Sequence, residues 1–167
     1  TTDLEKMYWN YLNAFSRFFA FTVTVGFSMT SVCYPMSIDP ACGDGLNPVY
    51  RASSTDDLVR FTDQEKTVIY RALMDVIPLF RSRIRIFTPR CALYALYRRH
   101  SGADSGARHA CRGGTDFFFI DAAGGDTYPC GFRGNENLGP FAAVDLDTRK
   151  RTATCTSCDW ECFRDPS

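Results

Sequence analysis

Residues 111–130 read CRGGTDFFFIDAAGGDTYPC, and residues 155–162 read CTSCDWEC. In the first stretch, the apolar run 117–120 is followed by a turn-forming run rich in Gly, Ala and Asp and then by a second short run. This order is typical of a β-hairpin. The hairpin is predicted to return Cys130 towards Cys111, which would bring two sulfur ligands together.

The second stretch supplies further sulfur atoms. Cys155 and Cys158 are separated by two residues, and this spacing lets the chain curl so that both sulfurs point at one metal centre. Cys162 follows after three more residues. A thiolate site needs about four soft ligands that converge on one point, so the last third of the chain is predicted to bind a metal or an iron–sulfur cluster.

At these residues the sequence resembles a known family. Segment 111–130, with Cys155 and Cys158 behind it, is similar to the SPASM or twitch extension of radical S-adenosylmethionine enzymes. In that family a cysteine, a short strand, a glycine and, after four intervening residues, a second cysteine open the auxiliary-cluster fold. Gly125 and Cys130 have this spacing, and residues 134–139 resemble the family's glycine–asparagine connection. The resemblance covers residues 109–167 specifically and the rest more loosely.

The resemblance implies a ligand set and a cofactor. The implied ligands of an auxiliary [4Fe–4S] cluster are Cys111, Cys130, Cys155 and Cys158. Cys162 is a fifth thiol, which would serve as a reserve or would exchange with one of the four. Four protein thiolates favour electron transfer, because direct ligation of a substrate needs an open iron. Trp160 and Phe163 are expected to pack over the cluster and exclude water.

One departure from the family limits the activity. The C-x3-C-x2-C motif that binds the S-adenosylmethionine-cleaving cluster is absent, because the only cysteines before position 91 are Cys33 and Cys42. The isolated chain is therefore not expected to cleave S-adenosylmethionine. We interpret it as the C-terminal part of an oxidoreductase of this family that modifies a peptide or a small molecule. Its missing N-terminal portion would bind S-adenosylmethionine and a second [4Fe–4S] cluster, and the catalytic residues stay unassigned.

The termini and the composition agree with this interpretation. The chain has 167 residues and begins with Thr1, so we expect a piece of a longer protein, although a mature protein without its signal peptide would also lack Met. Nineteen basic and nineteen acidic residues balance, which argues against nucleic acid as a partner. No apolar run reaches the ~20 residues of a membrane span. Because the cysteines cluster at ligand-like spacing, a reducing cytoplasm is favoured over a disulfide scaffold.

Residues 1–100 read as α/β. Spacing and residue type predict, in order, a helix over 3–19, a strand over 21–27, a long loop over 31–58, a helix over 62–80, a strand over 83–87 and a helix over 89–100. Thr62 and Glu65 form the capping box of the central helix. Parallel strands need such a crossover helix. The family resemblance makes residues 1–100 the last βα units of a partial (β/α)6 barrel, followed by the small cysteine-rich hairpin domain over 101–167.

Several polar residues are further candidates. Ser28, Thr30 and Thr88 follow the strands and would face substrate and cofactor at the barrel mouth, unless they are ordinary loop hydroxyls. His100 and His109 flank a basic Gly/Ser-rich loop, which is either a zinc or anion site or a solvated linker.

Three other residues have candidate roles. Asp126 and Glu136 are candidate acids or bases near the cluster, whereas turn-forming Asp and exposed Glu are also common structural features. Cys91 is expected to be a buried structural thiol. The alternative for the whole cysteine set is a non-catalytic zinc module, because zinc also accepts four thiolates.

Overall fold

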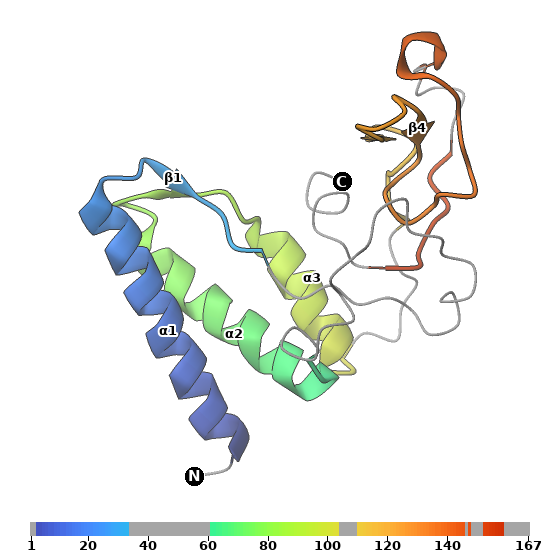
Figure 1. The fold of residues 1–167 in the computed structure, drawn as a ribbon. Coiled ribbons are helices and arrows are strands. Elements are labelled where there is room, and N and C mark those ends of the chain that lie inside the picture. Colours follow the sequence, from blue (N-terminus) through green and yellow to red (C-terminus); the bar gives the residue numbers. More distant parts are fainter. Residues whose placement is uncertain (1–2, 34–60, 104–109, 146, 148–151, 159–167) are drawn as a thin grey trace. The chain divides into compact units, whose positions relative to one another are not determined.

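The computed structural model describes residues 3–33, 61–103, 110–145, 147 and 152–158 (Figure 1). These residues belong to two compact units. The first unit contains the described residues up to 103, and the second contains those from 110 onward. No helix among the described residues is long and apolar enough to cross a membrane.

Helix α1 (Asp3–Val25) is longer than predicted. The predicted strand over 21–27 is wrong, because the helix continues through the β-branched run and turns Thr22 to the same buried face as Phe19. The hydroxyl of Thr22 donates to the Phe19 carbonyl at 2.9 Å, so the helix satisfies this polar group itself. Gly26 then ends the helix with φ of +89°, a left-handed conformation that only glycine adopts at little cost. The amides of Gly26 and Phe27 bond the carbonyls of Val23 and Thr22 in a Schellman motif.

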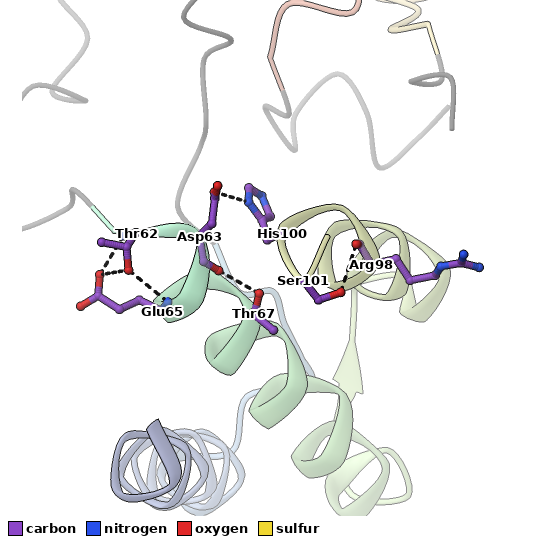
Figure 2. Close-up of polar contacts among 7 residues, drawn as sticks. All are labelled: Thr62, Asp63, Glu65, Thr67, Arg98, His100 and Ser101. Carbon is purple, nitrogen blue, oxygen red and sulfur yellow. Dashed lines mark hydrogen bonds and ion pairs between the residues drawn. The ribbon is translucent and has the colours of Figure 1, made fainter. Parts of the chain in front are cut away.

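Helix α2 (Asp63–Phe80) is confirmed together with its capping box. The Thr62 hydroxyl accepts from the Glu65 amide at 3.2 Å, and the Thr62 amide donates to the Glu65 carboxylate at 2.7 Å (Figure 2). These bonds satisfy amides that have no partner within the first turn of a helix. Apolar residues at helical spacing form the buried face of α2, namely Val68, Ile69, Ala72, Leu73, Val76 and Ile77.

The two strands of the first unit are short. Strand β1 (Met29–Thr30) pairs with β2 (Arg85–Ile86) in parallel, with Met29 opposite Arg85. The predicted strand over 83–87 is therefore confirmed in place, and helix α2 is the crossover between parallel strands that the sequence predicts. The barrel itself stays a prediction, since the described residues of this unit contribute one parallel pair.

Helix α3 (Arg90–His100) completes the first unit and begins directly after Pro89, as predicted. Its Leu93 and Leu96 enter a core in which α2 packs against both α1 and α3. Cys91 lies on the exposed side of α3, so its predicted burial is wrong. The buried residues of this core are Phe19, Ile69, Tyr70, Leu73, Val76, Ile77, Phe80, Ile84, Leu93 and Leu96.

The second unit contains the predicted hairpin. Strands β3 (Phe119–Ile120) and β4 (Thr127–Tyr128) pair antiparallel, and a short 3-10 helix, η4 (Phe141–Ala143), follows. Asp121 shapes the turn between the strands, because its carboxylate accepts the amides of Ala123 and Gly124 at 3.3 and 3.2 Å.

Candidate metal centre

Cys111 and Cys155 lie opposite each other in the second unit. They form an antiparallel bridge, in which the Cys111 amide donates to the Cys155 carbonyl at 2.7 Å. This backbone pairing joins two segments that are far apart in the sequence. It therefore brings a cysteine of the first motif beside a cysteine of the second.

The hairpin adds a third cysteine to this pair. Cys130 follows β4 and shares one apolar cluster with Cys111, Phe132 and the partly buried Cys155. The prediction that the hairpin returns Cys130 towards Cys111 is confirmed. Cys111 and Cys130 are 7% and 8% exposed, so their thiols are removed from water. The cluster is closed by the aromatic rings of Phe117, Phe119 and Phe132.

Two glycines allow the segment after Cys111 to pack closely against the hairpin. Gly114 has φ of +82°, and a Cβ atom added there would lie 2.7 Å from the Pro129 Cβ atom. Only glycine fits this position, because a methyl group would both strain the backbone and overlap with Pro129. The tight turn also points the Gly113 amide at the Cys111 sulfur, 3.3 Å away. Sequence reasoning missed this role, although the Gly-Gly pair directly after Cys111 is a visible signal.

Backbone amides also affect the Cys130 thiol. Burial raises the pKa of the Cys130 thiol, and the neighbouring Cys155 adds to this rise. The backbone amides of Phe132 and Arg133 oppose the rise in this pKa, as does the charge of Arg133. Amide and cationic donors favour a thiolate, and the thiolate is the form that binds metals.

The fourth predicted ligand, Cys158, is buried in the same unit, at 9% exposure. Cys155 donates to the Ser157 hydroxyl at 3.6 Å, within the C-x2-C segment. The fifth thiol, Cys162, lies outside the described residues, as do Trp160 and Phe163. Over the described part of the chain, no group of three or more His, Cys, Asp or Glu side chains is placed so that it could hold a metal ion. The structure thus places Cys111, Cys130 and Cys155 in one apolar cluster, but it does not arrange their side chains as a metal-binding group.

The other candidate ligands have structural partners or lie elsewhere. Nδ1 of His100 is 2.8 Å from Oδ1 of Asp63 (Figure 2). The His100 ring also stacks on Tyr70, so this histidine joins α3 to α2 in the first unit. Cys33 and Cys91 are exposed in that unit. His109 and Cys42 lie outside the described residues.

The candidate acids and bases also have structural partners. Asp126 accepts from the Asn137 amide group at 2.7 Å, and Glu136 pairs with Arg133. Both carboxylates therefore hold the backbone segment after Cys130 in shape. Neither contact indicates a proton-transfer role for Asp126 or Glu136.

The predicted barrel-mouth hydroxyls do not share one position. Thr88 is buried at 3% exposure, and its hydroxyl accepts from the Val32 amide at 3.3 Å. It therefore ties the segment after β1 to the segment after β2. Ser28 is exposed, and Thr30 is half-buried and bonds weakly to the next carbonyl. A shallow open groove borders Thr88 and Arg85 at the carboxyl end of β2.

Comparisons with known proteins place no family beside this geometry. No protein-family model matches the chain, and neither a curated protein nor a solved structure matches it.

Proposed function

We propose that the second unit binds an iron–sulfur cluster through Cys111, Cys130, Cys155 and Cys158. The observation that carries the proposal is the meeting of three cysteines from three separate segments in one buried cluster. A disulfide would need only two of them. Three cysteines in one cluster, with a fourth close in sequence, are the residue types that a thiolate metal centre uses.

The surroundings of the sulfurs support the same proposal. The Cys111 sulfur accepts the Gly113 amide, and hydrogen bonds to sulfur are one of the means by which a protein tunes an iron–sulfur cluster. Phe117, Phe119 and Phe132 exclude water from the site. When bound, an iron–sulfur cluster would supply one-electron transfer. The residues of this chain would hold it, shield it and set its charge environment.

The wider proposal is that this chain is the C-terminal part of a radical S-adenosylmethionine enzyme. The parallel β1–β2 pair with its crossover helix is the repeating unit of such an α/β domain. Helix α1 also exposes Phe18, Phe21 and Val25 along one face, and exposed apolar faces of this kind mark packing sites. A further α/β portion carrying S-adenosylmethionine and a second cluster would cover it. The substrate would be a peptide or a small molecule, and a reducing cytoplasm would keep the thiols free.

Anaerobic reconstitution with iron and sulfide, followed by visible absorption before and after dithionite, tests the cluster proposal. The wild-type chain is expected to gain a broad visible absorption that bleaches on reduction, and Cys130→Ser is expected to lose most of it. The matched control is Cys91→Ser, which removes an exposed thiol of the first unit. Equal absorption in both variants would exclude Cys130 as a ligand.

Zinc is the alternative occupant, since it accepts the same four thiolates. A chain that takes up zinc and no sulfide under these conditions would be a structural metal module. In that case the second unit would serve folding or partner binding, without electron transfer.

A further inference from the structure

The outward face of the β1–β2 sheet exposes apolar side chains. The two strands lie beyond the C-terminal ends of α1 and α2 (Figure 1). Side chains alternate between the two faces of a sheet, and the inward ones, Ile84 and Ile86, pack in or against the core. The outward positions of the strands and their flanks hold Phe27, Met29 and Phe87, which are 56%, 56% and 65% exposed. Parallel sheets are normally covered on both faces, so this outward face is suited to a partner.

Arginine side chains share this face with the apolar residues. Arg85 is opposite Met29 in the strand register, so the two side chains point to the same side of the sheet. Arg83 is exposed two positions earlier in the chain, and Arg81 is exposed directly after α2. Within the described part of the chain, none of these three arginines forms an ion pair. Their guanidinium groups are therefore available to an anionic partner.

The sequence around this face lacks acidic residues. Neither residues 6–38 nor residues 76–103 include Asp or Glu, although the chain has nineteen of them. Asp75, the acidic residue nearest to the arginines in the sequence before them, accepts a hydrogen bond from the Tyr8 hydroxyl at 2.8 Å. The arginines thus give this end of the first unit a positive potential, which attracts anionic groups.

A shallow groove adjoins the same face. Arg81 and Arg85 line it together with the apolar side chains of Ile84, Ile86 and Phe87. Arginine binds phosphate through parallel hydrogen bonds, and the apolar side chains offer contacts to hydrocarbon. The groove therefore combines the two contacts that an anionic amphiphile needs.

Two other occupants fit this face less well. A second copy would meet it through a symmetric interface, which brings the same unpaired arginines of both copies together. Nucleic acid is bound mainly through many phosphate contacts, whereas this face has three arginines and the whole chain has no net charge. An anionic lipid surface, in contrast, offers phosphate to the arginines and hydrocarbon to the apolar side chains.

We propose that this face binds the surface of a bilayer that contains anionic phospholipid. Phe27, Met29 and Phe87 enter the boundary between headgroups and acyl chains, and the three arginines contact lipid phosphates. Such peripheral binding needs no membrane-spanning segment. The inference is independent of the proposed cluster, because every residue that it uses lies in the first unit.

Co-sedimentation of the full chain with lipid vesicles tests this inference. The chain is expected to bind vesicles of phosphatidylcholine mixed with phosphatidylglycerol, and to bind pure phosphatidylcholine much more weakly. Added salt is expected to weaken the binding, because it screens the arginines from the lipid charge. Arg85→Gln is expected to weaken it about fivefold, the usual effect of one basic residue near an anionic surface. Phe87→Ser is expected to weaken it about tenfold through loss of apolar burial.

The second unit provides matched control variants. Phe141 is 55% exposed there, so Phe141→Ser removes a similarly exposed aromatic ring. Arg112 pairs with Asp116, so Arg112→Gln removes one positive charge that already has a partner. Neither control is expected to change vesicle binding. Far-UV circular dichroism of every variant separates lost binding from lost folding, and exposed positions of this kind usually change stability little.

The outcomes decide the inference. It is overturned if the folded chain does not bind anionic vesicles, or if it binds pure phosphatidylcholine equally well. Equal losses in Phe87→Ser and Phe141→Ser would also overturn it, because the effect would not belong to this face. Tighter binding of single-stranded RNA than of vesicles would assign the face to nucleic acid, and a dimer that Phe87→Ser dissociates would assign it to a second copy. Either result would contradict the inference.

Discussion

The two units are stabilised in different ways. Among the described residues of the first, three helices bury a core of ten residues, led by Tyr70, Phe19 and Leu73. In the described part of the second, the core cluster has three buried residues, and two of them are cysteines. Such a small apolar core contributes little burial energy, and small domains of this kind usually rely on metals or cross-links. The comparison teaches that the cysteines of the second unit occupy the place that leucine and phenylalanine hold in the first.

Removal of the proposed metal should produce the largest difference in stability between the two units. Chelation of the metal-bound chain is expected to unfold the second unit, whereas helices α1, α2 and α3 stay folded. The reason is that thiolate metal sites contribute about 10 kcal/mol or more to the folding of small domains. Hydrogen exchange should then speed up at Cys111, Phe119 and Thr127 and stay slow at Leu73. Equal loss of protection in both units would contradict this picture.

A core truncation tests the opposite side of the comparison. Leu73 is fully buried in α2, so Leu73→Ala is expected to destabilise the first unit by about 2 to 5 kcal/mol through loss of apolar contact and the cavity it leaves. Denaturant unfolding followed by far-UV circular dichroism measures this effect. The control is Leu79→Ala in the same helix, which is 67% exposed and should change stability by less than about 0.5 kcal/mol. Cluster content should be unaffected by either change.

A glycine substitution probes the geometry around Cys111. Gly114→Ala is expected to cost about 1 to 3 kcal/mol, because the new methyl group overlaps with Pro129 and the backbone is left-handed. It should also reduce iron uptake, since it separates the Cys111 segment from the hairpin. Gly125→Ala is the matched control, with φ of +73° and open space around the position. Similar iron uptake in the two variants would show that the contact with Pro129 does not set the site.

The smallest predicted effect concerns the capping box. Thr62→Ala is expected to cost about 1 kcal/mol of first-unit stability. Its amide and hydroxyl bonds lower the pKa of Glu65 below the ordinary value of 4.5. A lowered carboxyl pKa gives stability that is present above pH 4.5 and is lost as the pH falls through the lowered value. The stability difference between wild type and Thr62→Ala should therefore narrow in acid, where the bond from the Thr62 hydroxyl to the Glu65 carboxylate is lost, and a constant gap down to pH 2 would contradict this linkage.

The sequence was sufficient where the local signals agreed. Helix α2 has a capping box and apolar residues at 3.6-residue spacing, and both signals indicate the same element. The hairpin was predictable because its Gly-rich turn separates two short runs. In both cases the local sequence and the tertiary contacts favour the same structure.

Prediction failed where tertiary packing decided the outcome. Residues 21–25 have the β-branched composition of a strand, and yet they extend α1, because Thr22 packs beside Phe19 and bonds back to its carbonyl. Cys91 matched an apolar pattern, but the rotation of α3 exposes it. The role of Gly114 depends on its contact with Pro129, and spacing alone does not reveal such a contact.

The most direct test of the central claim is anaerobic analysis of iron, sulfide and zinc in the purified and reconstituted chain. The claim predicts about four iron and four sulfide per chain, with a loss of this content when Cys111 or Cys130 is replaced by Ser. One zinc and no sulfide would contradict it, and the second unit would then be a structural zinc module.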